Sequence, residues 1–243
     1  MKILLTGANG YIGMRLLPKL LDAGHEVICA VRDPKRLSIT KDILKRIKVI
    51  TIDFSYISEA EKVPNDIDAA YYLLHSMSSD SGDFEKIENL CAHNFCSILE
   101  KTTIKQVIYL SGIVNDQNLS KHLRSRKNVE QILKNASFDL TVLRAGIIVG
   151  SGSASFEIIR DLCEKIPFMI TPKWVRTKSQ PIAIRNVIEF LTGVLMHPKC
   201  MNDSFDIGGS DILTYKQMLH SYARIRGFKN WIWIVPVMTP RLS

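Results

Sequence analysis

Short apolar segments alternate with amphipathic segments along the first 150 residues of the chain. The apolar segments lie at 2–6, 26–32, 48–53, 69–74, 106–111 and 140–149. Most are almost continuous in apolar residues, which is typical of strands that are covered on both faces. Helical spacing of apolar residues is found between them, at 10–23 and at 83–101. This repeated order predicts a parallel sheet with right-handed crossovers, an α/β domain of the doubly wound kind.

The alternation of strand and helix patterns becomes less regular after residue 150, where turns precede shorter strands and helices. The last predicted helix lies at 214–226. We therefore expect a core at 1–150, followed by a small C-terminal substrate lobe at 151–243 that completes the same domain. The sequence stops at "TPRLS" without an obvious closing element. We expect a further C-terminal domain to be missing here.

Composition restricts the class of protein. The 243 residues are 46% hydrophobic, enough for one large core, and no apolar run approaches the ~18 residues that span a bilayer. The five cysteines follow no metal-binding spacing, so we expect reduced thiols, no metal and a cytoplasmic location. The first residues read as a strand and a turn rather than as a signal peptide.

The formal net charge of +8 has two interpretations, an anionic partner or a soluble basic surface. Much of the excess lies at 32–48, where seven Lys and Arg face two Asp. No aromatic residues alternate with these cations, and no helix-turn-helix or zinc-finger pattern is present. We expect no nucleic-acid partner.

A glycine-rich turn, "TGANGYIG" at 6–13, follows the first strand and opens the first helix. Gly7 suits a tight turn, Gly10 lets backbone approach a pyrophosphate, and Gly13 lets the helix pack against the strand. The helix N-terminus adds unpaired N–H groups and a partial positive charge. This context predicts a dinucleotide-binding Rossmann fold, and the alternative is a turn without a ligand. The predicted cofactor contacts here are Gly7, Asn9, Gly10, Tyr11, Ile12 and Gly13.

The end of the second strand bears on the choice between NADP and NAD. Arg32 and Asp33 are adjacent there. An acidic residue would hold the free ribose hydroxyls of NAD, whereas an arginine would hold the 2′-phosphate of NADP. A shift of one residue exchanges the two side chains, and Arg32 has the alternative of being a solvated strand-end charge. The basic stretch that follows favours NADP(H) over NAD(H).

The next two strand ends supply further candidates. Asp53 and Phe54 follow the third strand, and Leu74, His75 and Ser76 follow the fourth. The carboxyl ends of neighbouring parallel strands form the crevice where such sheets bind ligands. His75 is equally well interpreted as a structural histidine.

The spacing TGxxGxxG resembles the short-chain dehydrogenase/reductase superfamily, in its extended and atypical branches. The segments "HLRSR", "SASFEIIRDL", "PIAIRNV", "DIGGSDILTY" and "VPVMTPRLS" are similar to the NmrA-like atypical reductases of the YbjT type. The resemblance covers essentially the whole chain. It implies NAD(P) binding, an aspartate near the adenine amine at Asp53, and a segment at Gly146 that passes the nicotinamide.

Catalytically active members of the superfamily carry a serine at the end of the fifth strand and a YxxxK pair on the next helix. The resemblance places Ser111 at the strand end, but His122 and Arg126 stand at the tyrosine and lysine positions. Histidine titrates near neutral pH and can supply a proton, whereas arginine holds anions and does not give up its proton. The alternative is an exposed helix face, because other basic residues surround the pair.

Two functions follow as expectations. The first is an NADP-dependent oxidoreductase on a small carbonyl or unsaturated substrate, with Ser111 orienting the substrate, Arg126 holding the cofactor and His122 donating a proton. The second is a non-catalytic redox sensor or an assembly or regulatory protein, which would bind a protein partner. We expect Trp231 and Trp233 to pack against the missing C-terminal region.

Overall fold

The computed structural model describes residues 1–74, 84–113 and 121–235, without the side chains of Lys121 and His122. The described chain forms two compact units. Within the described ranges, the first unit consists of residues 1–144 and 188–206, and the second of 145–187 and 207–235. Each unit is built from two separate stretches of the sequence.

The first unit holds the seven-stranded sheet. Its strands are β1 (Lys2–Thr6), β2 (Glu26–Val31), β3 (Ile47–Thr51), β4 (Ala69–Tyr72), β5 (Gln106–Gly112), β6 (Asp139–Ala145) and β11 (Asp203–Ile207). Its helices are α1 (Gly13–Asp22), α2 (Lys41–Lys45), α3 (Phe84–Leu99), α4 (Lys121–Lys134) and most of α6 (Ile184–Gly193), with 3₁₀ turns η1 (Pro34–Arg36), η2 (Ile57–Lys62) and η4 (Pro198–Cys200).

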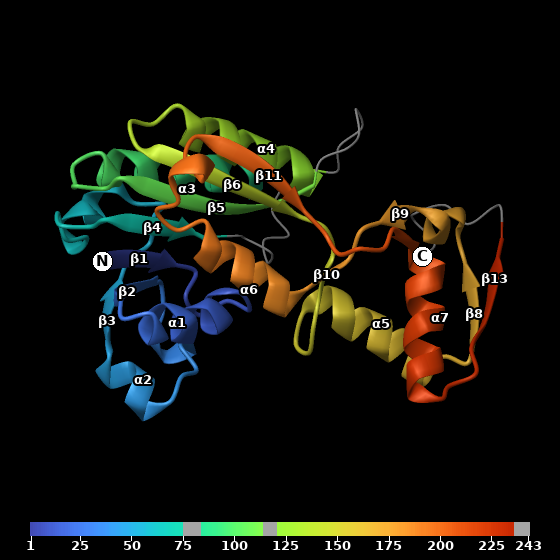
Figure 1. Cartoon of the computed structure of the whole chain (residues 1–243). Coiled ribbons are helices and arrows are strands. Elements are labelled where there is room, and N and C mark those ends of the chain that lie inside the picture. Colours follow the sequence, from blue (N-terminus) through green and yellow to red (C-terminus); the bar gives the residue numbers. More distant parts are fainter. Residues whose placement is uncertain (75–83, 114–120, 236–243) are drawn as a thin grey trace. The chain divides into compact units, whose positions relative to one another are not determined.

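The strand order is β11-β6-β5-β4-β1-β2-β3 (Figure 1). β1 pairs in parallel with both β2 and β4, and the pairs β2–β3 and β4–β5 are also parallel. The chain leaves β1 toward one edge and returns to the other side through β4, so the order reverses between β1 and β4. The predicted doubly wound α/β fold is confirmed, and the ligand crevice of such a sheet is expected at this reversal.

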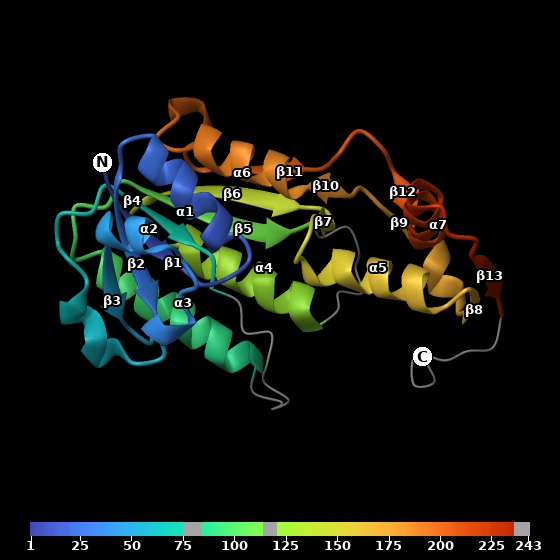
Figure 2. The same cartoon turned by 90° about the horizontal axis from the view of Figure 1, so that it is seen from below.

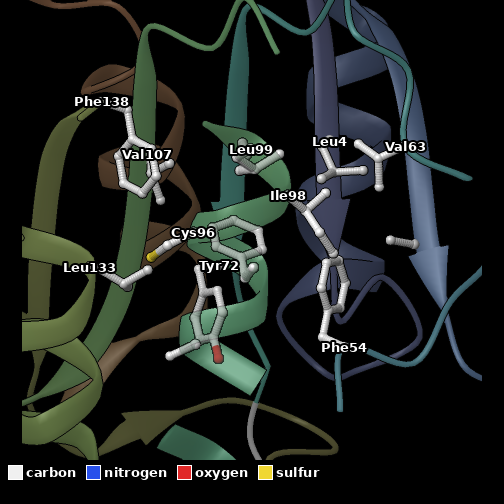
Figure 3. Packing of buried hydrophobic residues seen from close by; sticks show 14 of the residues in the cluster. Leu4, Phe54, Val63, Tyr72, Cys96, Ile98, Leu99, Val107, Leu133 and Phe138 are labelled. Carbon is white, nitrogen blue, oxygen red and sulfur yellow. The ribbon is translucent and has the colours of Figure 1, made fainter. Parts of the chain in front are cut away.

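Helices cover both faces of this sheet. α3 and α4 lie on one face, and α1 and α6 on the other (Figure 2). Because side chains alternate along a strand, neighbours such as Tyr71 and Tyr72 enter opposite layers. Leu4, Tyr72 and Val107 share one buried cluster with Phe95 and Leu99 of α3. Figure 3 shows Leu4, Tyr72, Leu99 and Val107 in this layer. This two-sided burial explains why the strands contain so few polar residues.

Residues 188–206 close the first unit through a buried polar anchor. Gln106 is fully buried in β5, and its Nε2 donates to Thr141 Oγ1 (2.8 Å) and to the Val194 carbonyl (3.0 Å). Its Oε1 accepts from the Met196 N–H at 2.6 Å. Met196 has a positive φ of 53°, a conformation that costs a non-glycine residue energy. One glutamine therefore fixes the segment that follows α6.

The second unit is smaller and is built from paired short strands. The pairs are β7 (Ile148–Val149) with β10 (Ile182–Ala183), β9 (Lys178–Ser179) with β12 (Leu213–Thr214), and β8 (Phe168–Thr171) with β13 (Trp231–Ile234). Two helices, α5 (Ala154–Lys165) and α7 (Tyr215–Arg226), and the turn η3 (Lys173–Arg176) complete it. α7 begins with a capping box at Thr214 and ends at Gly227 in the left-handed conformation, as its sequence favours.

Two expectations differ from the structure in detail. The strand expected at 140–149 is two strands, β6 and β7, because the chain turns at Gly146 and Ile147. The lobe expected at 151–243 is distributed over both units, since residues 188–206 belong to the first. That the C-terminal residues complete one domain stays a prediction. Among the described residues, no helix is long and apolar enough to cross a membrane.

Candidate functional site

The turn between β1 and α1 is held against the neighbouring strand β4. The Thr6 hydroxyl is buried, donates to the Tyr71 carbonyl (2.9 Å) and accepts from the Leu73 N–H (3.0 Å). Gly7 has a φ of 63°, and a Cβ there would lie 2.5 Å from the Leu73 carbonyl oxygen. Glycine is therefore required at position 7 by both conformation and space.

Gly13 packs the first turn of α1 directly onto the same loop. A Cβ at Gly13 would collide with the Gly7 carbonyl oxygen and lie 2.8 Å from Ala8 Cα. Gly10 closes the turn with an N–H donated to the Gly7 carbonyl at 2.9 Å. The predicted reasons for Gly7 and Gly13, a tight turn and close helix packing, match this geometry.

The N-terminus of α1 is suited to an anion. Within the described chain, no side chain caps this helix and its first turn contains no acidic residue. Arg15 lies one turn inside, with its guanidinium 3.8 Å from the centre of the Tyr11 ring. The helix dipole and the N–H groups of the first turn therefore face the loop without a competing carboxylate.

A cavity of about 570 Å³ opens at the carboxyl ends of β1 to β4, a size typical of small-molecule sites. It brings together eight of the predicted cofactor residues: Gly7, Asn9, Gly10, Arg32, Asp33, Asp53, Phe54 and Leu74. Tyr11, Ile12 and Gly13 belong to the same loop and helix start but do not line the cavity. The crevice predicted from the strand ends is thus a real cavity.

Arg32 and Asp33 have different environments at the end of β2. Asp33 caps η1, where its Oδ1 accepts the Lys35 N–H at 3.0 Å. Arg32 is exposed and lines the cavity together with Arg36. Two guanidinium groups and one carboxylate therefore border this part of the cavity.

Asp53 and Phe54 form the opposite side. Ser55 holds Asp53 Oδ1 through its N–H (2.9 Å) and its hydroxyl (2.7 Å). The Phe54 ring is buried and meets Phe95 edge-on, with ring centroids 5.5 Å apart, and Phe95 meets Tyr72 in the same way at 4.8 Å. Phe54 and Tyr72 line the cavity, and both rings pack edge-on against the buried Phe95 behind them.

Helix α3 supplies a wall that the sequence reasoning missed. Ile87, Leu90, Glu88 and Cys91 line the cavity, although the apolar members were interpreted as part of the helix's core-facing stripe. Ile87 is 38% and Leu90 47% exposed, because these side chains border the cavity rather than enter the core. The sequence did contain a signal for this wall, because the apolar stripe of α3 is wider than one core-facing side of a helix needs. Arg36 was also missed as a site residue, within a basic stretch that gave no position a distinct role.

Cys91 reports on the charges around this cavity. Burial raises the pKa of its thiol, the Asp53 carboxylate adds to the rise, the Arg32 guanidinium opposes it and the Glu88 carboxylate adds to it, and together they bring the pKa to about 11. Arg32 and Asp53 therefore act on Cys91 across the cavity. A raised pKa means that the thiolate is scarce at neutral pH.

We expect Cys91 to be alkylated slowly by iodoacetamide at pH 8, about a hundredfold more slowly than a thiol with the ordinary pKa near 9. The rate should rise about tenfold per pH unit toward pH 11, and saturating dinucleotide should block it. Arg32→Ala should slow the reaction, because it removes the charge that lowers the pKa. Peptide mass spectrometry measures each cysteine, with Cys200, outside the cavity lining, as the control. Equal labelling of Cys91 with and without nucleotide would contradict this placement.

Ser111 and Arg126 both lie near the end of β5. Ser111 is 2% exposed, and its hydroxyl has no hydrogen-bond partner among the described residues. Arg126 is half-buried on α4, and its Nη1 lies 3.2 Å from where a Cβ on Gly112 would be. No carboxylate in the described part of the chain forms an ion pair with Arg126. Arg126 is thus half-buried rather than fully solvated, and its role toward a cofactor stays a prediction.

Three predicted residues fall wholly or partly outside the described residues. His75 and Ser76 lie outside them, and so does the side chain of His122, whose backbone belongs to the first turn of α4. His122 stands four residues before Arg126, one helical turn away. Its proposed role stays a prediction.

Gly146 lies in the second unit, where its N–H donates to the Ile207 carbonyl at 3.0 Å. A Cβ there would collide with the Gln180 carbonyl oxygen. The glycine is thus required by a neighbouring backbone segment. Its approach to a nicotinamide ring stays a prediction.

The parallel sheet, the glycine turn and the cavity at the strand reversal define a Rossmann-type nucleotide-binding protein. The model of the NAD(P)H-binding family matches residues 7–165. The chain belongs to this family, and the expected kinship with NmrA-like atypical short-chain reductases is confirmed.

Curated relatives are distant. The chain is 22% identical to divinyl chlorophyllide a 8-vinyl-reductase of Arabidopsis thaliana over 85% of this chain and 53% of that protein. It is 29% identical to dihydroflavonol 4-reductase of Hordeum vulgare over 46% of this chain and 36% of that protein. It is 24% identical to the photosystem II assembly factor Ycf39 of Synechocystis over 62% of this chain and 46% of that protein. The chain thus spans about a third to a half of the length of these relatives.

Solved structures share the fold. UDP-glucose 4-epimerase of Thermotoga maritima superposes with a TM-score of 0.77 at 16% identity, over 100% of this chain and 88% of that one. UDP-glucuronic acid 4-epimerase of Bacillus cereus superposes with a TM-score of 0.76 at 17% identity, over 97% of this chain and 86% of that one. At such identities the likeness extends to the fold alone.

Proposed function

We propose that this protein is an NADP(H)-dependent reductase acting on a small carbonyl or unsaturated substrate. The choice of NADP(H) rests on the different environments of the acidic and basic side chains that follow β2. Arg32, Asp33 and Arg36 all line the cavity, but Asp33 Oδ1 is already engaged in capping η1. Two guanidinium groups suit a 2′-phosphate, because arginine binds phosphate through paired N–H donors.

The substrate class is supported by two relatives whose names describe reductases, one acting on a vinyl group and one on a dihydroflavonol. A bound nicotinamide supplies a hydride. In our proposal the unpaired Ser111 hydroxyl orients the substrate oxygen, and the Arg126 guanidinium holds the cofactor and offsets developing negative charge. His122 would donate a proton to the substrate after hydride transfer, since imidazole exchanges protons near neutral pH.

The preference for NADP(H) is tested by Arg32→Ala. One lost charge-assisted contact, roughly 1.5–3 kcal/mol, should weaken NADP binding about ten- to a hundredfold and leave NAD binding nearly unchanged. Isothermal calorimetry with both nucleotides measures this. Lys35→Ala is the matched control, because it removes a neighbouring charge that does not line the cavity. Equal losses for NADP and NAD in Arg32→Ala would refute the assignment.

A second candidate is a dinucleotide sensor or assembly protein without turnover. The observation in its favour is the absence of YxxxK, with the arginine at the lysine position beside Ser111. The positive charge of Arg126 opposes protonation of a nearby histidine, which is the wrong direction for an acid catalyst. The relative named as a photosystem II assembly factor supports the assembly role.

Cofactor oxidation across a panel of carbonyl and enone substrates separates the two candidates. Turnover that falls at least about a hundredfold in His122→Ala, with NADPH affinity unchanged, supports the reductase. The absence of turnover, together with NADP⁺ and NADPH affinities that differ severalfold, supports the sensor.

A further inference from the structure

An exposed apolar face lies on the ribbon of β8 and β13 in the second unit. Along each strand every second side chain points outward, and the register places Trp231 beside Phe168 and Trp233 beside Ile170. These four residues, which we call the ribbon face, are 59–71% exposed. The residues between them, Met169 and Ile232, are buried in the unit's own core. The ribbon is therefore stable on its inner side and uncovered on its outer side.

The unit that carries this face also carries almost all of the net charge. Residues 145–187 and 207–243 contain eleven Lys and Arg against four Asp and Glu, whereas the rest of the chain contains twenty-one against twenty. The positive charge at 32–48 is thus balanced by acidic residues elsewhere in the first unit, and the net positive charge of the chain lies almost entirely in the second unit.

Cations surround the ribbon face. Lys229 precedes β13 by two residues and Lys173 follows β8 by two, and both are exposed. A hollow of about 590 Å³ adjoins the face at Trp231, and its lining includes Arg224, Lys229 and Phe228 but no carboxylate. Among the described residues, Lys173, Arg224 and Lys229 form no ion pair. Aromatic surface and unpaired cations therefore meet in one place.

From this combination we infer that the ribbon face and its adjoining hollow bind the surface of an anionic phospholipid bilayer. Tryptophan favours the boundary between headgroups and acyl chains, where its ring is apolar and its N–H stays hydrated. Lysines and arginines beside such side chains gain from the negative surface potential of the lipid. A second copy of this chain would bring an equally basic surface to the same place, and the like charges would repel.

The test is co-sedimentation of the full chain with phosphatidylcholine vesicles, with and without phosphatidylserine. We expect binding to the anionic vesicles only, weakened by salt, and a blue shift of tryptophan emission. Trp231→Ala/Trp233→Ala should lower the partition coefficient at least about tenfold. Leu44→Ala/Ile212→Ala, which truncates exposed apolar residues off the ribbon, should leave it unchanged.

Charge is tested in the same way. Arg224→Glu/Lys229→Glu should abolish anionic selectivity, whereas Lys101→Glu/Lys134→Glu, equal in charge but in the first unit, should reduce binding by less than about threefold. Trp231→Phe/Trp233→Phe should retain binding. In each variant Trp174, whose ring lies 5.4 Å from that of Tyr215, reports the fold of the second unit by its emission.

Three results would overturn the inference. One is the absence of binding to either vesicle. Another is a dimer, seen by sedimentation, that the double alanine variant disrupts. The third is tighter binding to an acidic polypeptide such as polyglutamate than to the vesicles, which would assign the face to an acidic protein.

Discussion

Gly13→Ala should lower dinucleotide affinity at least about a hundredfold and destabilise the protein by about 2–3 kcal/mol. The added methyl meets only backbone: the Gly7 carbonyl oxygen and Ala8 Cα. Backbone cannot rotate away as a side-chain tip can, so either the loop or the start of α1 must move. The movement displaces the N–H groups that face a diphosphate, and two lost charge-assisted contacts account for the loss of affinity.

Calorimetry and urea unfolding measure the two effects. Gly193→Ala is the matched control, because nothing lies within 4 Å of a Cβ there and the residue ends α6 in an ordinary conformation. It should bind normally and be unchanged or slightly more stable, since alanine is the better helix former. Normal nucleotide binding by Gly13→Ala would show that the diphosphate does not rest on this turn.

Gln106→Ala should cost about 3–5 kcal/mol of unfolding free energy without touching the cavity. The substitution removes three hydrogen bonds at once and leaves the part-buried Met196 N–H without its partner, whereas the Val194 carbonyl keeps the His197 N–H at 3.2 Å. Each buried group without a partner costs about 1–3 kcal/mol, and Met196 then loses the contact that supports its positive φ. Because folded domains are stable by only about 5–15 kcal/mol, this loss is severe.

Chemical denaturation measures the change, and nucleotide affinity should be retained at low temperature wherever the variant is folded. Gln131→Ala is the control, since Gln131 is exposed on α4 and its side chain donates to Asn135, the residue that follows the helix. It should change stability by less than about 0.5 kcal/mol. A loss below about 1 kcal/mol in Gln106→Ala would mean that water replaces the lost partners.

The strands were predictable because burial on two faces leaves a distinct pattern. Every apolar segment of the first 112 residues became a strand within one or two residues of its expected bounds. The segment at 140–149 did not, because the turn at Gly146 is imposed by the backbone of Gln180, which is remote in sequence. The sequence also did not indicate that residues 188–206 belong to the first unit. They are held there by Gln106, which is remote in sequence and, in the sequence alone, resembles any polar residue that begins a strand.

The site followed the same division. Gly7, Arg32 and Asp53 were predictable from their place at strand ends, where the fold itself puts ligand contacts. Glu88 and Cys91 were not, because a helix wall depends on how the helix is rotated against the sheet. Arg126 could be placed on the side of α4 that faces β5 only from the structure, where its guanidinium lies next to Gly112.

The interrupted sequence of the first unit has a consequence for biosynthesis. A ribosome that has emitted the first six strands has not yet supplied α6 or the edge strand β11. Until then the nascent chain exposes the open side of β6 and leaves Gln106 without two of its partners, both features that invite misassociation. The sheet of the first unit is therefore completed only after residues 145–187 of the second unit have been synthesised, and until then the nascent chain exposes these groups to chaperones and to misassociation.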